Sequence, residues 1–284
     1  MPIGLIGLLL TNKYVPNPIN QHKGGFDLPG QISGIISIAV LAFSLIQAGK
    51  SGWFAETVLL GFCIFIITFI TFLFIEQRAT APMFPLVFFR SRTFAIAIAA
   101  GMFLNIGFYG EIFMLPLYFQ QLRGYSILMT GLAILPQTGI VAIGSYLGGK
   151  IASKIGPKMP MVFGLAIGAA GFFLLLIAKQ DTAYLLLILP LIAIGFGTAF
   201  TMPAATIAVI NSVPENRAGI ASGALNASRQ VGSLLGVAIF GTIISTATHF
   251  TTGMHNALLI GGTAFLCGCL MTLLLIKQTR FITV

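Results

Sequence analysis

Two charged side chains lie inside apolar segments of this sequence, where a charge needs a reason. Glu111 stands in the stretch FLNIGFYGEIFMLPLYFQQ, with no lysine or arginine near it in the chain, and Arg229 lies within a later apolar run. A carboxylate in such a segment can gain and lose a proton or pair with a cation. A guanidinium keeps its charge and carries several hydrogen-bond donors. These two residues are therefore the first candidates for function.

The remaining reactive residues, histidines and cysteines, do not form a pattern typical of an enzyme. The histidines His22, His249 and His255 are scattered in predicted loops or at helix ends. Cys267 and Cys269 lie two apart, so on a helix they point about 200° away from each other. No metal-ligand cluster, nucleophile–base set or phosphate-binding loop appears, and we expect no metal, no cofactor and no enzymatic activity. Basic residues do not cluster with aromatics, so no nucleic-acid partner is expected either.

Composition places these residues in a membrane. The chain of 284 residues is 57% hydrophobic and 7% charged, with a mean hydropathy of +1.00. Soluble domains are about 25% charged, and a helix needs about 20 apolar residues to cross a bilayer. We predict an all-α polytopic membrane protein whose full spans are 29–49, 54–75, 94–121, 126–149, 159–178, 183–211, 219–247 and 254–276.

The loops between these spans alternate in charge, which predicts the orientation. One set of loops carries Lys13, Lys23, Arg78, Arg90, Arg92, Lys150, Lys154, Lys158, Arg217, Lys277 and Arg280. The other set carries Lys50, Arg123 and Lys179. Cytoplasmic loops hold the excess of Lys and Arg. We therefore expect the loops with eleven basic residues, and the C-terminus, to lie in the cytoplasm.

Five regions follow from this pattern. Residues 1–10 resemble the end of a truncated span, and residues 11–28 form a polar cytoplasmic linker. Residues 29–75 form a separate transmembrane hairpin, 76–93 an interfacial cytoplasmic loop, and 94–284 a six-helix unit. Ser212 and Glu215 have the spacing of a capping box, which predicts a helix start there.

The six-helix unit divides into two triples whose first spans, 94–121 and 183–211, are both interrupted by glycine and proline. In secondary transporters such helices, at corresponding places in inverted repeats, indicate the substrate site. The alternative is that glycine and proline are simply common in membrane helices. On the first interpretation the residues that line the cavity or couple protons are Glu111, Tyr118, Asn105, Pro116, Thr198, Thr201 and Pro203.

The two intramembrane charges each allow two interpretations. A bare ion at the depth of Glu111 costs about 3 kcal/mol or more, so the carboxyl faces protein or water. It is either a proton-coupling group beside a cavity or a structural acid hydrogen-bonded to a neighbouring helix. Arg229, flanked by Asn226 and Gln230, either pairs with Glu111 or holds backbone carbonyls, and we favour a structural role. Around it the small residues Gly219, Gly223, Ala227, Gly232 and Gly236 predict close helix packing.

One loop carries a family signature. The stretch GGKIASKIGPKMP resembles the loop motif of the major facilitator superfamily, Gly-x-x-x-Asp-Arg/Lys-x-Gly-x-Arg/Lys. Gly149, Lys154, Gly156 and Lys158 match, whereas Ser153 stands where the family has aspartate. The stretches LPLYFQQLRGYSILMTGLAILP, PMFPLVFFRSRTF and VPENRAGIASGALNASRQVGSLLGVAIFGT resemble the fourteen-span drug:proton antiporter branch, the EmrB/QacA type.

The resemblance implies a function and partners. It implies the C-terminal six-helix half of a major facilitator fold, preceded by the extra hairpin of the fourteen-span branch, with the N-terminal half absent. The implied activity is proton-coupled efflux of drugs or amphipathic cations across a bacterial inner membrane. The implied partners are protons, the lipid bilayer, a small amphipathic substrate, a periplasmic adaptor, and a separate N-terminal six-span half or a second copy. The alternative is a truncated membrane subunit or scaffold that does not itself transport.

Overall fold

The computed structural model describes residues 10, 28–79, 82 and 86–276. Eight of its helices are long and apolar enough to cross a membrane. The first two are α2 (Leu28–Ser51) and α3 (Glu56–Arg78). After the short η1 (Leu86–Arg90) come α4 (Arg92–Leu117), the π-helical η2 (Tyr118–Leu122), α5 (Ile127–Ile155), α6 (Lys158–Leu174), η3 (Leu175–Ile177), α7 (Tyr184–Ile210), η4 (Glu215–Arg217), α8 (Ala218–Thr246) and α9 (Phe250–Leu275).

All eight predicted spans are present, which confirms the all-α membrane fold. The predicted truncated span 1–10 and linker 11–28 lie outside the described residues, apart from Leu10 and Leu28. The fourth span is longer than predicted, because α5 continues to Ile155 and only Gly156 and Pro157 separate it from α6. Gly156 has a φ of 90°, a left-handed conformation that favours glycine and allows this tight turn.

The predicted capping box at Ser212 is wrong. The Ser212 hydroxyl donates to the carbonyl oxygen of Ala208 in the preceding helix, at 2.5 Å. Helix α8 begins later, at Ala218, after the turn η4. Ser212 therefore bonds back to the last turn of α7 rather than capping the start of α8, because a serine hydroxyl can also donate to a carbonyl one turn back.

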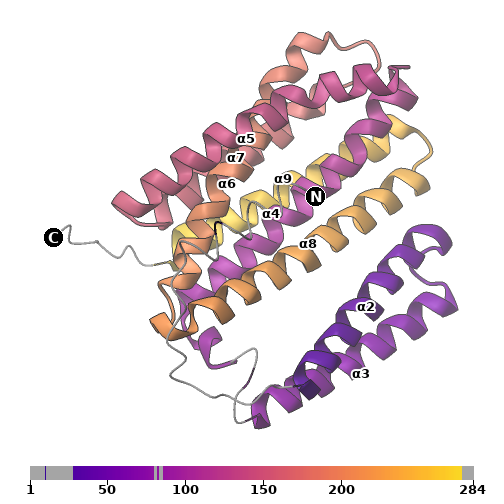
Figure 1. Cartoon of the computed structure of the whole chain (residues 1–284). Coiled ribbons are helices and arrows are strands. Elements are labelled where there is room, and N and C mark those ends of the chain that lie inside the picture. The colour runs from indigo at the N-terminus through magenta and orange to yellow at the C-terminus, as the bar shows by residue number, and fades with distance from the viewer. Residues whose placement is uncertain (1–9, 11–27, 80–81, 83–85, 277–284) are drawn as a thin grey trace.

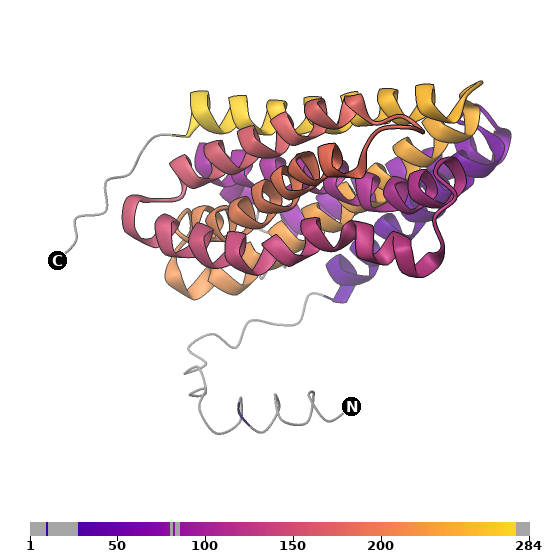
Figure 2. The ribbon, with the colours of Figure 1, turned by 90° about the horizontal axis from the view of Figure 1, so that it is seen from above.

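Helices α4–α9 pack as two interlocked triples. Helix α4 of the first triple packs most extensively on α8 of the second, and α7 of the second packs on α5 of the first. Likewise α6 packs on α7, α9 packs on α4, and α6 and α9 pack on each other. Exchanging α4–α6 with α7–α9 leaves this scheme unchanged, as inverted repeats require. Figures 1 and 2 show the helices running side by side, with α5 and α9 along opposite faces.

Glycines allow the closest approaches in both triples. A side chain on Gly148 of α5 would overlap the carbonyl oxygen of Phe200 on α7. In the same way, side chains on Gly232 and Gly236 of α8 would overlap the carbonyl oxygens of Met102 and Ile106 on α4. Close backbone packing through small residues is the usual basis of helix association in membranes. The prediction for Gly232 and Gly236 agrees with this packing, whereas nothing lies near the missing side chains of Gly219 and Gly223.

The hairpin α2–α3 lies beyond α8, at the edge of the bundle in Figure 1. It contacts the six-helix unit mainly through α2, where Leu41 and Leu45 pack with Ala238 of α8 in a small cluster. Within the hairpin, Gly61 of α3 lies directly over the side chain of Ser44. Most apolar side chains of α3 point outward, as lipid contact requires.

Candidate transport site

The Glu111 side chain is completely buried, and among the described residues its carboxyl is hydrogen-bonded only to Gln137. The Gln137 Nε2 group of α5 donates to Glu111 Oε2 of α4 at 2.7 Å. Both side chains are enclosed, with exposed fractions of 0% for Glu111 and 1% for Gln137. The helical span α4–η2 that carries Glu111 ends at Leu122, and the helix that carries Gln137 begins at Ile127. Each side chain lies about 15 Å along its helix from that end. This distance is half of a hydrocarbon core about 30 Å thick, so the pair lies at mid-depth.

Helix α7 closes this pair from a third side. Gly195 packs directly against the backbone carbonyl and side chain of Gln137, so closely that any larger residue at this position would overlap them. Thr198 follows one turn later and is also buried. Among the described residues, Glu111 Oε1, Gln137 Oε1 and Thr198 Oγ1 have no hydrogen-bond partner. The site thus holds an acid and an amide, each with a spare oxygen acceptor, and α7 packs against the amide-bearing residue at Gly195.

Arg229 does not pair with Glu111 in this structure. Its Nη2 group donates to the carbonyl oxygen of Met202 at 2.9 Å and to Thr206 Oγ1 at 3.3 Å, both on α7. Its side chain also lies beside Gly101 of α4, which is about 15 Å along that helix from Glu111. Arg229 therefore joins α8 to α7 by holding a backbone carbonyl, the second of the two roles considered for it.

The other predicted cavity residues do not gather around Glu111 through hydrogen bonds. Asn105 donates to the carbonyl of Gly101 in its own helix, and Thr201 to that of Gly197. Tyr118 donates to the carbonyl of Lys179 at 2.9 Å, which fastens the end of α4 to the loop before α7. These three contacts are structural in this conformation.

The prolines of α4 and α7 differ in how much they disturb the helix. Beyond Pro116 the helix widens into the π-turn η2, where the N–H of Arg123 donates to the carbonyl of Tyr118 at 3.2 Å. A proline removes one backbone donor and crowds the preceding turn, and π-turns often mark functional helices. By contrast, α7 runs as a continuous helix through Pro190 and Pro203.

The remaining predicted site residues lie at the surface or in the α5–α6 turn. Asn226 and Gln230 are exposed on α8. Gly149, Ser153 and Lys154 belong to the last turns of α5, and Lys158 begins α6. The Ser153 hydroxyl donates to the carbonyl of Lys150 in its own helix at 2.9 Å. The motif therefore spans two helix ends rather than a long loop.

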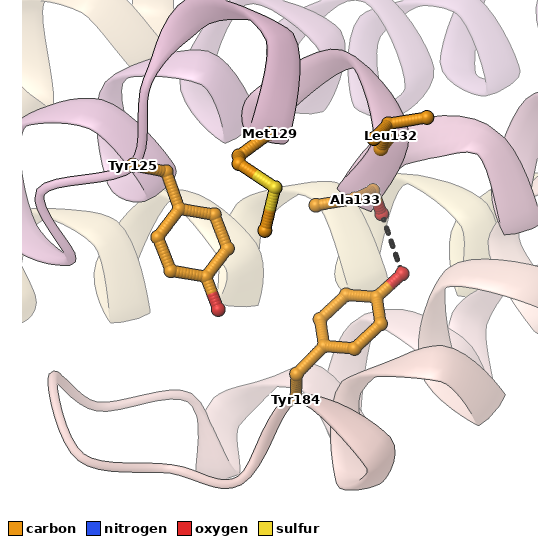
Figure 3. A pocket seen from close by; sticks show the side chains of 5 residues that line it. All are labelled: Tyr125, Met129, Leu132, Ala133 and Tyr184. Atoms are coloured by element: carbon orange, nitrogen blue, oxygen red, sulfur yellow. Dashed lines mark hydrogen bonds between the residues drawn. The ribbon is translucent and has the colours of Figure 1, made fainter.

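A small cavity lies at the end of the bundle that the sequence predicts to face outward. It has a volume of about 160 Å³ and is lined by Tyr125, Met129, Leu132, Ala133 and Tyr184. Figure 3 shows the Tyr184 hydroxyl donating to the carbonyl of Ala133, at 3.2 Å. Sites for drug-sized ligands enclose about 300–1,000 Å³. The cavity is too small for such a ligand in this conformation.

Sequence reasoning missed Gln137, the only hydrogen-bond partner of Glu111 among the described residues. Its signal was available, because Gln137 is a polar residue inside an otherwise apolar span and directly follows Pro136. A polar side chain in a membrane span needs a partner. The sequence did not indicate which of the neighbouring helices would provide it.

Interlocked triples of membrane-length helices around a buried mid-depth acid are typical of membrane carriers. Comparison with known protein families then shows to which family the chain belongs. The sequence profile of the Major Facilitator Superfamily matches residues 2–237, so this chain belongs to that superfamily. Its members are transporters rather than enzymes, in agreement with the expectation from the sequence.

Several individual proteins of known name are similar to this chain. The multidrug resistance protein Stp of Mycobacterium tuberculosis is 31% identical over 90% of this chain and 47% of its own length. The methylenomycin A resistance protein of Bacillus subtilis is 28% identical over 95% of the chain and 58% of its length. The tetracenomycin C resistance and export protein of Streptomyces glaucescens is 30% identical over 87% and 46%. The chain spans about half the length of these curated relatives.

Proposed function

We propose that this chain contributes the six-helix half and the extra hairpin of a proton-coupled exporter of the fourteen-span branch. Its cargo is a drug or another amphipathic cation, carried out across a bacterial inner membrane, with the C-terminus in the cytoplasm. Three relatives whose names refer to multidrug or antibiotic resistance support the export of small molecules. A second six-helix half, from a separate chain or a second copy, would complete the transport path, and a periplasmic adaptor is a further candidate partner.

The observation that carries the proposal is the buried carboxyl of Glu111, held at mid-depth by a neutral amide. A carboxyl whose partner has no charge of its own can change protonation without breaking an ion pair. Alternating exposure of such a group to the two sides of the membrane would couple proton entry to cargo exit. A cationic cargo would compete with the proton for the same carboxyl.

The test is dye efflux driven by an imposed proton gradient. Residues 1–284 are expressed in drug-hypersensitive cells, alone and with any six-span chain that copurifies, and the protein in the membrane is quantified. We expect gradient-dependent efflux that Glu111→Gln abolishes, because glutamine cannot exchange a proton. The matched control is Glu215→Gln, which removes an exposed acid of η4 and should leave efflux unchanged.

Two results would contradict the proposal. Efflux with an unaltered pH dependence in Glu111→Gln would remove Glu111 from proton coupling. Absence of efflux from a well-inserted chain under every partner condition would favour the alternative, a membrane subunit that does not itself transport.

A further inference from the structure

We propose that Gln137 is the positioning residue of Glu111 and keeps its carboxyl partnered in both protonation states. This inference rests on the proposed function, in which Glu111 exchanges a proton. The observed bond stabilises the ionised carboxylate of Glu111, since Gln137 Nε2 donates to Glu111 Oε2. The amide also has an acceptor, Oε1, which has no partner in the structure. A half-turn of the amide lets Oε1 accept the O–H of the protonated acid.

The surroundings hold the amide in place for this exchange. Gly195 of α7 lies against the Gln137 backbone and the Cγ of its side chain. This contact restricts the stem of the side chain on that side, whereas the terminal amide can turn about its last bond. Helices α4 and α5 contact each other far less than either contacts its main partner. The Glu111–Gln137 bond is therefore a principal link between these two helices, and it survives proton uptake.

No charged or titratable side chain is bonded to Glu111 among the described residues; its bonded partner is the neutral amide of Gln137. On α8, Arg229 is occupied by Met202 and Thr206 of α7. On α9, the His255 ring lies 2.8 Å from the carbonyl of Ala178. In α4, Gly107 and Gly110 lie four residues and one residue before Glu111. They face the phenyl rings of Phe265 and Phe240, respectively. Among the described residues, Gln137 is thus the one side chain bonded to the Glu111 carboxyl when its charge changes.

The experiment is infrared difference spectroscopy on the purified full chain in lipid vesicles, titrated with pH. The carbonyl stretch of protonated Glu111 is assigned as the band that Glu111→Gln removes. Gln137→Met keeps the length of the side chain but has neither an amide donor nor an amide acceptor. We expect this variant to move the band to higher frequency, as for an acid without a hydrogen bond.

The control is Thr130→Val. Thr130 is buried two turns before Gln137 on the same face of α5, and its hydroxyl has no hydrogen-bond partner among the described residues, so the loss of this hydroxyl should leave the band in place. If Gln137→Met fails to fold, Gln137→Glu supplies the second variant, because two adjacent acids sharing a proton titrate in two steps. An unmoved band in Gln137→Met, or one wild-type step in Gln137→Glu, overturns the inference. This measurement needs no cargo and no transport, so it fails independently of the efflux test.

Discussion

The two triples of helices share one packing scheme but differ in the polar link between their first two members. In the first triple an acid of α4 meets an amide of α5, fully enclosed at mid-depth. In the second triple a guanidinium of α8, only partly buried, meets a carbonyl and a hydroxyl of α7. Both links join helices that otherwise contact each other little.

The difference concerns what each link can do. A guanidinium stays protonated, so the Arg229 link has one state and can only be present or broken. The carboxyl of Glu111 has two protonation states, and its amide partner can serve both. The repeated architecture therefore supplies two equivalent places for a polar link. On the proposed function, only the Glu111 link carries chemistry that responds to protons.

The largest effect should come from breaking the packing that the triples share. Gly148→Ala on α5 and Gly236→Ala on α8 each place a methyl group against a backbone carbonyl of the facing helix. A backbone contact is not relieved by a rotamer change, so we expect each to lower the free energy of unfolding by about 3 kcal/mol. Reversible unfolding in mixed micelles measures this.

The matched controls are Gly139→Ala on α5 and Gly223→Ala on α8, where nothing lies within 4 Å of the added methyl group. Alanine is the better helix former, so these variants should be neutral or stabilised by up to about 1 kcal/mol. Equal losses in all four variants would show that glycine acts through helix flexibility, and the shared packing scheme would lose its energetic basis.

The next prediction separates the two polar links by their contribution to stability. Arg229→Met removes both bonds to α7, and interhelical hydrogen bonds in membranes are worth about 0.6–1.7 kcal/mol. We expect a loss of about 1–2 kcal/mol in the same unfolding assay. Glu111→Gln retains an amide partner for Gln137, so its unfolding free energy should change by less than about 0.5 kcal/mol. The reverse ranking would make Glu111 the structural group and Arg229 the dispensable one.

Helix positions and the two triples were predictable from the sequence because length, apolar runs and loop charges report directly on a membrane span. The start of α8 was not, since Ser212 has a hydroxyl that fits either a helix start or a helix end. The partners of Glu111 and Arg229 were not predictable either. Periodicity gives the face on which a side chain lies, whereas the facing helix depends on how the triples interlock.

The glycines illustrate the same limit. Gly219 and Gly223 form one small-residue row and Gly232 and Gly236 another, and only the second row meets a neighbouring backbone. The nine residues from Gly223 to Gly232 turn a helix by about 180°, so the two rows lie on opposite faces of α8. A row of small residues permits close packing without saying whether a helix lies against it, and α4 lies against the second row alone.

The smallest effect should come from Thr206→Val, which tests how the Arg229 link divides its energy. Arg229 Nη2 is closer to the Met202 carbonyl, at 2.9 Å, than to Thr206 Oγ1, at 3.3 Å. We therefore expect Thr206→Val to cost about 0.5 kcal/mol. A double-mutant cycle with Arg229→Met should give a coupling energy below about 1 kcal/mol. A larger coupling would mean that the hydroxyl, which also donates to Met202 at 3.0 Å, orients the carbonyl for the guanidinium. The second link would then be a cooperative network, more like the first link than its single charge state suggests.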